Sequence, residues 1–348
     1  MLCGNCGKAN SKGAVFCGGC GTRLPQYEEE TKERRRLDLA GLRNSYPVDF
    51  LVRLVEKENL PVLAFLVLNV FIIGAILANL MYWDLWFATL VGLGVYVLTS
   101  AAVLSPVGEV IFRFFSGCRR ISDPDEQARL IPLFEKVYGK VKEAEPSVSG
   151  KVRLYMKNED LPDAFTLGRN TICITRGLLA MPDEMIEAAI SHEFGHLARK
   201  DTDRMFVVAA GYIFITAVFL ILKVVVIVFD WLVKVSGWLT GIFWLGFAVH
   251  IVCTLSKYLV MFLLYAGMFI WRGLEMLLCG WSKKLNEYQA DRFAYGLGYG
   301  NPLCSVIGCT ATEGRKRDGV LAYLTGGSAG KEERIRRLME MGAVYGGQ

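Results

Sequence analysis

Long segments without charged side chains restrict the fold of this chain more than any other feature. Residues 60–83 and 86–104 contain no charge, and residues 205–229 contain one, Lys223. A bilayer core about 30 Å thick requires about 20 apolar residues of helix. Each of these segments is therefore long enough to cross a membrane.

The fourth apolar region, residues 237–281, is longer than a single crossing requires. We expect one crossing at 206–229, a return at 238–263, and a separate helix at 264–281 that follows the interface. With 53% hydrophobic and 21% charged residues, the composition fits a membrane protein with a water-exposed part. The predicted total is four transmembrane helices.

Residues 192–196, His-Glu-Phe-Gly-His, hold two of the only three histidines in the chain. Positions i and i+4 lie on one face of a helix, so His192 and His196 can both point at one zinc ion. Glu193 is placed to take a proton from a water molecule that the zinc activates. The apolar periodicity after residues 182–184 supports the helix. We predict a zinc hydrolase site with Glu193 as its base.

A third zinc ligand is expected downstream, in the segment Asn-Glu-Tyr-Gln-Ala-Asp that begins at Asn286. A catalytic zinc takes three protein ligands and leaves one position open, and Glu287 fits the third place. Asp291 lies one helical turn further on. It is expected to accept the other ring N–H of a ligating histidine and so to fix the orientation of that ring.

Beyond these motifs, the chain resembles the HtpX-type integral-membrane zinc metallopeptidases, relatives of the type 1 CAAX prenyl proteases. The resemblance covers most of residues 110–340 and is carried by residues 163–169, 174–179, 183–188 and 332–338. It implies a gluzincin-type α+β protease domain, with Arg334 as a transition-state stabiliser. Two positions depart from the family pattern: Asp163 stands in place of Asn, and Ser328 in place of His.

The active site is expected on the cytoplasmic side of the inner membrane. His192, His196 and Glu287 must meet on one side, so the chain must cross an even number of times between them. Basic residues precede the first span and follow the second, as the positive-inside rule requires of cytoplasmic segments. They are Lys32, Arg34, Arg35, Arg36, Arg43, Arg53, Lys57, Arg113, Arg119 and Arg120. The N-terminus is then cytoplasmic too, and the net charge of +5 requires no nucleic-acid partner.

The N-terminus carries a second expected metal site. Cys3, Cys6, Cys17 and Cys20 form two Cys-x2-Cys pairs with the spacing of a structural zinc site. So small a segment does not fold without its metal. We predict a zinc ribbon that folds separately from the protease, because a charged linker follows it.

The expected order is a zinc ribbon, a linker, a transmembrane hairpin, the first protease part, a second hairpin with its connecting helix, and the second protease part. These occupy residues 1–24, 25–58, 59–107, 108–204, 205–280 and 281–348. Within them we expect helices at 48–57 and 125–144 and strands at 152–156 and 171–175. The alternating pattern of 171–175 suggests an edge strand, which could pair with an extended substrate.

The sequence thus predicts a multi-pass membrane zinc metalloendopeptidase with one catalytic and one structural zinc. Its partners would be the lipid bilayer and polypeptides, mainly membrane proteins, and an oligomer is compatible with the sequence. The resemblance implies a role in membrane-protein quality control. The alternative is a zinc-dependent membrane scaffold that uses the protease fold and the ribbon to bind partners. An intact Glu193 argues against it, since a scaffold has no need for this residue. Processing of prenylated C-termini would require more membrane helices than this chain offers.

Overall fold

The computed structural model describes residues 2–10, 14–22, 24, 46–240, 243–309 and 330–346. Most of the expected linker, residues 25–45, lies outside this set, and so does Ser328. The chain divides into two compact units. The first comprises Met1–Leu63, Ser100–Val207 and Gly280–Gln348, and the second Ala64–Thr99 and Val208–Cys279.

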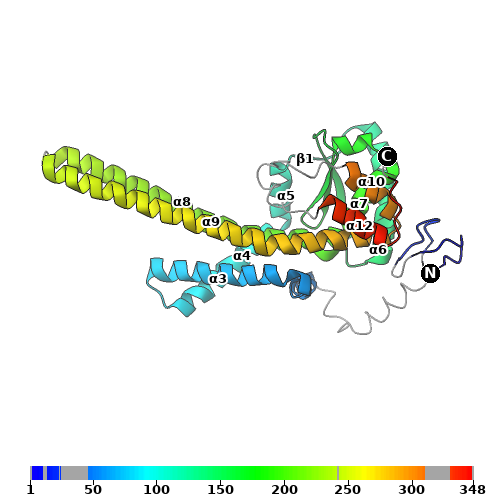
Figure 1. Cartoon of the computed structure of the whole chain (residues 1–348), viewed down its shortest axis with the longest axis horizontal. Helices are drawn as coiled ribbons and strands as arrows, with labels where there is room; N and C mark the ends of the chain where they lie inside the picture. Colours follow the sequence, from blue (N-terminus) through cyan, green and yellow to red (C-terminus); the bar gives the residue numbers. More distant parts are fainter. Residues whose placement is uncertain are drawn as a thin grey trace. The chain divides into compact units, whose positions relative to one another are not determined.

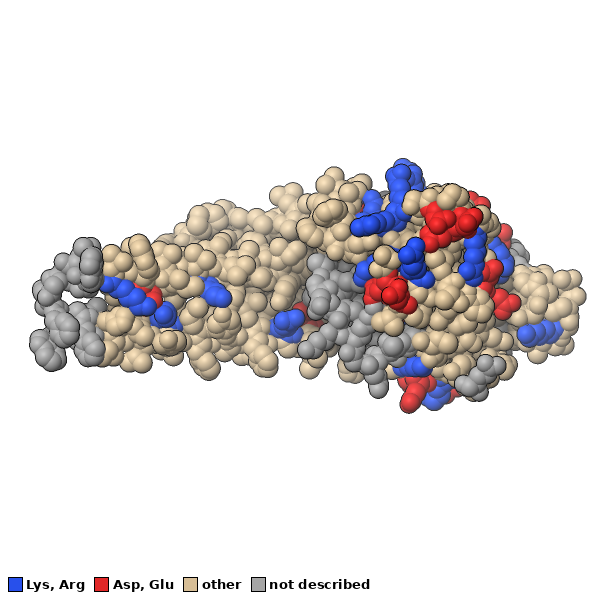
Figure 2. Space-filling view, turned by 90° about the horizontal axis from the view of Figure 1, so that it is seen from above, with Lys and Arg blue, Asp and Glu red and all other residues tan. Residues whose placement is uncertain are grey.

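The second unit consists of helices that are long and apolar enough to cross a membrane. Its helices belong to α3 (Leu60–Met81), α4 (Leu85–Val103), α8 (Asp201–Thr240) and α9 (Phe243–Gly296). By length and composition, the expected number of four is confirmed for the described residues. Figure 1 shows α8 and α9 running side by side, and Figure 2 shows few charges on the surface of this hairpin.

The expected separate helix at 264–281 is wrong, because these residues continue α9 without a break. No proline interrupts this stretch, so its backbone hydrogen bonds continue without a break. Trp271 stacks on Phe65 of α3 with ring centroids 4.8 Å apart. Segment 264–281 is therefore part of the hairpin.

The first unit contains a four-stranded sheet in the order β1-β2-β4-β3. Its strands are β1 (Cys118–Arg119), β2 (Arg153–Lys157), β3 (Ala164–Leu167) and β4 (Thr171–Thr175). β4 pairs with β2 in parallel and with β3 in antiparallel fashion. The expectation that 171–175 is an edge strand is therefore wrong: all five residues of β4 are buried, and the edge strands are β1 and β3.

The first unit also contains several helices. They are α2 (Tyr46–Leu54), α5 (Pro106–Phe115), α6 (Pro124–Ala144), α7 (Asp183–Arg199), α10 (Gly300–Cys309) and α12 (Lys331–Glu340), with short 3-10 turns η2 (Lys57–Asn59) and η3 (Arg176–Ala180). α6 begins as expected, with the Asp123 side chain accepting from the Asp125 N–H at 2.9 Å. Buried apolar residues of α6, α7, α10 and α12 share one core cluster.

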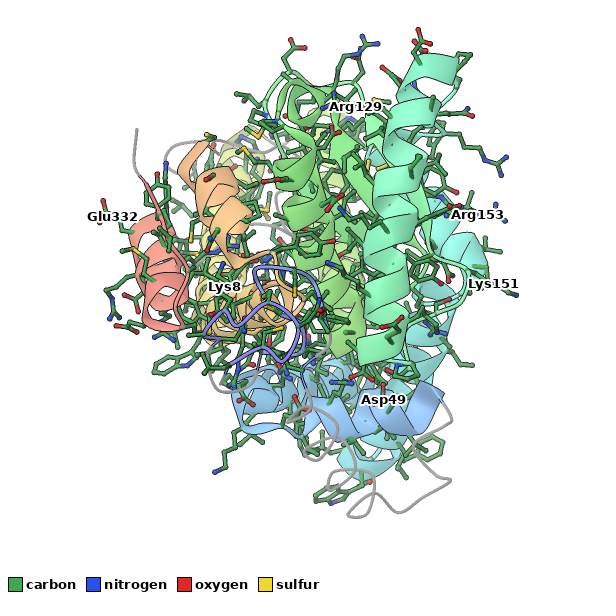
Figure 3. All side chains as sticks on the ribbon, turned by 90° about the vertical axis from the view of Figure 1, so that its right-hand side faces the viewer. Lys8, Asp49, Arg129, Lys151, Arg153 and Glu332 are labelled. Carbon is green, nitrogen blue, oxygen red and sulfur yellow. The ribbon has the colours of Figure 1, made fainter. Side chains whose placement is uncertain are left out.

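Arg129 of α6 holds the start of α7 (Figure 3). Its Nε donates to Asp183 Oδ1 at 2.8 Å, and its two Nη atoms donate to the carbonyls of Leu179 and Met181 at 2.7 and 2.8 Å. A guanidinium presents several donors in a fixed plane, which suits three acceptors at one helix end. The first turn of α7 is thereby fixed against α6.

The N-terminal segment packs onto the same unit. The backbone N–H groups of Val15 and Phe16 donate to the Gly296 carbonyl, at the end of α9, at 3.0 and 2.9 Å. Both side chains are buried in the core cluster, and the Lys140 ammonium lies 5.8 Å from the Phe16 ring and 4.4 Å from the Tyr299 ring. These residues join the segment to the protease core, while separate folding of the ribbon stays a prediction.

Candidate metal centres

Helix α7 carries the first set of candidate site residues. His192, Glu193 and His196 are brought together on its buried side, with candidate ligand atoms within 4.8 Å of one another. The two imidazoles meet edge to face, and their Nε2 atoms are 3.2 Å apart. The i and i+4 spacing thus produces the expected shared face.

Helix α9 adds Glu287 to this set. Its Oε2 lies 3.6 Å from His192 Nε2, and its Oε1 lies 3.5 Å from His196 Nε2. The two helices approach so closely because residue 195 is glycine: a Cβ there would lie 2.8 Å from Ala290 Cα. Gly195 therefore allows α9 to place Glu287 beside the histidines.

The three candidate ligands fit a zinc ion. Ligand atoms about 2.0–2.1 Å from a tetrahedral zinc lie roughly 3.3 Å from each other. The distances of 3.2, 3.5 and 3.6 Å among the histidine nitrogens and the Glu287 oxygens match this spacing. Two neutral imidazoles and a carboxylate are also a donor set that zinc prefers.

Each histidine of the site also contacts a carboxylate through its other ring nitrogen. His192 Nδ1 lies 3.0 Å from Asp291 Oδ1, as expected for the residue one turn after Glu287. His196 Nδ1 lies 2.8 Å from Asp201 Oδ2. With Nδ1 engaged in this way, Nε2 of each ring is free to bind a metal.

The sequence interpretation missed Asp201, whose position depends on a tight turn. Lys200 alone separates α7 from α8, and it adopts the left-handed conformation with φ 59°. This reversal carries Asp201 back to His196. The fully buried Arg204 then pairs with Asp201 and donates to the Arg199 carbonyl at 3.1 Å. Acidic and basic residues at the start of an apolar span were the available signal.

Arg334 of α12 joins the carboxylates of the site. Its Nη1 lies 2.9 Å from Glu287 Oε2, and its Nε and Nη2 donate to Asp291 at 2.8 and 2.6 Å. Burial favours the neutral form of the guanidinium, but Asp291 and Glu287 outweigh that effect and raise the pKa of Arg334. The arginine therefore stays charged beside the candidate ligands.

The histidines show the same balance between burial and neighbouring carboxylates. Burial disfavours the charged imidazolium, yet hydrogen bonding to Asp291 and Glu287 raises the pKa of His192. Burial also lowers the pKa of His196. Hydrogen bonding to Asp201 and Glu287 outweighs this effect and raises that pKa well above its usual value. Carboxylates therefore lie beside both rings, which suits a bound cation.

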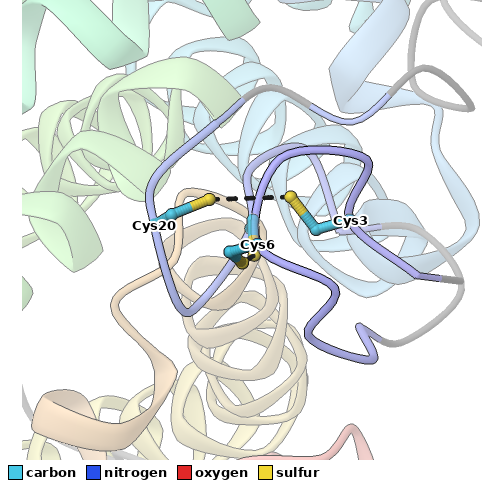
Figure 4. Close-up of side chains that lie close together, drawn as sticks. Cys3, Cys6 and Cys20 are labelled. Carbon is cyan, nitrogen blue, oxygen red and sulfur yellow. Dashed lines mark hydrogen bonds between the residues drawn. The ribbon is translucent and has the colours of Figure 1, made fainter.

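The four N-terminal cysteines form a second candidate metal centre. Cys3 and Cys20 have sulfur atoms 3.5 Å apart, and those of Cys6 and Cys17 are 3.4 Å apart (Figure 4). All four thiols are free and lie within 4.8 Å of one another. Thiolates about 2.3 Å from a tetrahedral zinc are roughly 3.8 Å apart. The four residues therefore fit a structural zinc.

The two cysteine pairs have the same backbone geometry. Gly7 N–H donates to the Cys3 carbonyl and Gly21 N–H to the Cys17 carbonyl, at 2.9 and 2.8 Å. Both glycines have φ 71°, which other residues rarely adopt. Burial opposes ionisation of Cys17, but the N–H groups of Gly19 and Cys20 lower its thiol pKa to about 7. The ionised form is the one that binds zinc.

Comparisons with known proteins support both centres. The model of a family described as peptidase family M48 matches residues 124–306, more than half of the chain. This region includes α7 and the part of α9 that carries Glu287. A zinc-ribbon domain model matches residues 2–24, which contain the four cysteines.

Individual proteins similar to this chain include a protease and a solved structure. A protease HtpX homolog of Caldanaerobacter subterraneus subsp. tengcongensis is 39% identical over 64 residues, which is 17% of this chain and 21% of the relative. The chain thus matches about a fifth of the length of that curated relative. The crystal structure of S. mikatae Ste24p aligns with a TM-score of 0.38 and 14% identity, over 90% of this chain and 66% of that one.

Proposed function

The chain belongs to peptidase family M48, and from that premise we propose that it is a membrane zinc metalloendopeptidase of the gluzincin type. The convergence of His192, His196 and Glu287 around one position, with Glu193 beside them, carries this proposal. Polypeptides are the substrate class that the family implies.

In this proposal, His192, His196 and Glu287 hold the zinc, and Asp291 and Asp201 hold the two imidazoles in orientation. When bound, zinc supplies a Lewis acid that activates water and polarises a peptide carbonyl. Glu193 takes the proton of the attacking water and gives it to the departing amine. Arg334, held by Asp291, places a positive charge beside the site and stabilises the transition state.

We propose that the substrate binds in extended form along β3, which is an edge of the sheet and contacts α7. An extended peptide adds to an open strand edge through main-chain hydrogen bonds, which require no particular side chains. Broad sequence tolerance follows from this mode. It suits the removal of damaged membrane proteins, and we propose quality control on the cytoplasmic side of the inner membrane as the role.

The test is Glu193→Gln in the full chain. We expect zinc content and folding to remain, because no ligand is removed, while cleavage of casein or of a membrane-protein substrate is lost. The matched variant His196→Ala should lose both cleavage and the catalytic zinc, and should keep the zinc of the ribbon. Zinc per chain is measured by atomic emission, and cleavage by gel electrophoresis.

If Glu193→Gln cleaves the substrate at the wild-type rate, Glu193 is not the base. The scaffold alternative predicts a different result. In that case the wild type shows no hydrolysis, and both variants still bind the same partner proteins.

A further inference from the structure

The helix α5, which directly follows a membrane span, presents an apolar face outward. Val107, Val110, Ile111, Phe114 and Phe115 are between 48% and 79% exposed. They recur at the spacing of one helical face. Surface helices of water-soluble proteins show the opposite pattern, with apolar residues inward.

The inward face of α5 is polar as well as apolar. Glu109 is buried and accepts from Thr171 Oγ1 at 2.5 Å, from Arg113 Nη1 at 3.3 Å and from Asn170 Nδ2 at 3.3 Å. Phe112 stacks on Phe206 with ring centroids 4.3 Å apart. The orientation of α5 is therefore fixed by the protein, and its exposed apolar face is a consequence of that fixation.

Two observations indicate what covers this face. Only Leu104 and Ser105 separate α5 from α4, and a Cβ at Gly108 would lie 2.1 Å from the Val103 carbonyl oxygen, so the chain bends tightly between the two helices. At the other end of α5, Arg119 and Arg120 are exposed. A helix that follows a candidate span closely, presents apolar residues outward and is followed by arginines matches the chemistry of an anionic membrane surface.

We propose that α5 is an interfacial helix whose outward face lies in the acyl–headgroup boundary of the bilayer. The Glu109 contacts then fix the turn between β3 and β4 to that surface. In this turn Gly168 has φ 62°, and a Cβ there would lie 3.0 Å from Glu109 Cγ. The edge strand β3 is thus held at a set distance from the membrane. This inference concerns lipid contact and stands whether or not the chain hydrolyses peptides.

The test places a photo-crosslinking phenylalanine analogue at position 114 of the full chain in anionic phospholipid vesicles. Val344 provides the matched control, since it is 71% exposed in the same unit but has no neighbouring span in the chain. We expect crosslinks to radiolabelled phospholipid at position 114, at least five-fold more than at position 344. Arg119→Glu with Arg120→Glu should reduce the position 114 crosslinks in anionic vesicles but not in neutral ones.

Equal lipid crosslinking at positions 114 and 344 would overturn the proposal, since it would report exposure alone. Crosslinks at position 114 to polypeptide, either a second copy or a substrate, would also overturn it. Folding is checked by zinc content, because both metal centres depend on the folded unit. If crosslinking to lipid succeeds while Glu193→Gln still cleaves, the proposed base is wrong and the interfacial helix remains.

Discussion

At the scale of single residues, the carboxylate behind each histidine is as important to the site as the ligands. Asp201→Asn keeps an acceptor for His196 Nδ1 but removes its charge. Such partners typically change metal affinity or activity by about 10–100-fold. We expect a loss of this size in zinc affinity, measured by competition with a chelator at fixed pH.

The matched control for Asp201→Asn is Asp203→Asn. Asp203 is also buried, two residues later on α8, and its Oδ2 lies 3.7 Å from Arg169 Nε. The Asp203→Asn variant should keep the zinc affinity of the wild type within a few-fold. If the two variants lose zinc equally, the effect comes from removing a buried charge, and Asp201 has no specific role toward His196.

Gly195 is the second residue on which the geometry depends. In Gly195→Ala the new Cβ would lie 2.8 Å from the backbone of α9 at Ala290, so one helix must move. Overpacking of this kind costs about 1–3 kcal/mol, and here it also shifts Glu287. We expect a lower unfolding temperature and loss of the catalytic zinc.

Gly139→Ala on α6 is the control for that variant, because a Cβ there has no neighbour within 4 Å. Replacing a helical glycine by alanine is favourable by about 0.5–1 kcal/mol. Zinc content should therefore stay unchanged and stability should rise slightly. A Gly195→Ala protein that behaves like Gly139→Ala would show that close approach of α7 and α9 is unnecessary.

Residue spacing predicted the candidate ligands because their geometry is local. His192 and His196 share a face for reasons internal to one helix, and Asp291 lies one turn from Glu287. Asp201 could not be predicted in the same way. The contact of Asp201 with His196 requires Lys200 to adopt the left-handed conformation. This conformation is uncommon for residues other than glycine, so the sequence does not predict it.

At the scale of elements, the N-terminal segment supports the end of α9. Phe16 is buried in the core of the first unit and lies beside Lys140. Phe16→Ala removes a buried ring, at a cost of about 3–5 kcal/mol. We expect a lower apparent unfolding temperature in detergent. The zinc of the ribbon should be retained, because the substitution leaves all four cysteines in place.

Leu2→Ala is the control, since Leu2 belongs to the same segment but is exposed. It should unfold at the wild-type temperature. Equal unfolding temperatures for Phe16→Ala and wild type would contradict the docking of the segment and support the prediction of a separately folded ribbon.

Helices and strands can be predicted where the periodicity of their own residues is sufficient. The position of a strand in the sheet depends on its pairing with other strands, and this cannot be predicted from its own residues. Helices α6 and α7 and strands β2 and β4 lie at or within a residue or two of their expected positions. β4 was taken for an edge strand because its alternation resembles one. Its burial on both faces comes from pairing with β2 and β3, and β3 is too short for its own pattern to be recognised.

At the scale of the whole molecule, helix lengths and charges indicate where the membrane lies on the second unit. α8 has 40 residues, which span roughly 60 Å, about twice a bilayer core. Asp230 lies 2.8 Å from Lys234 and 3.0 Å from Lys257 of α9. Asp230 lies 22 positions after Val208, which corresponds to roughly 33 Å of helix, so this ion cluster suits the far interface, and the hairpin continues beyond it.

Two crossings between His196 and Glu287 then return the chain to the side where it started, as the shared site requires. An added cysteine reports the side directly. Tyr82, in the turn between α3 and α4, is 96% exposed, and Lys234 belongs to the ion cluster. Ser122 and Lys151 are exposed in the first unit. Under the proposed orientation, an impermeant maleimide should label Tyr82→Cys and Lys234→Cys in intact cells.

Ser122→Cys and Lys151→Cys should react only after the membrane is permeabilised, and wild type provides the background from its own cysteines. Positive charge flanks the first span on its N-terminal side, and this bias sets the expected direction. Labelling of Lys151→Cys from outside, with Tyr82→Cys protected, would place the catalytic unit on the far side and overturn a cytoplasmic role. Labelling of Tyr82→Cys and Lys151→Cys from the same side would show that α4 does not cross the membrane, and would overturn the predicted hairpin of α3 and α4.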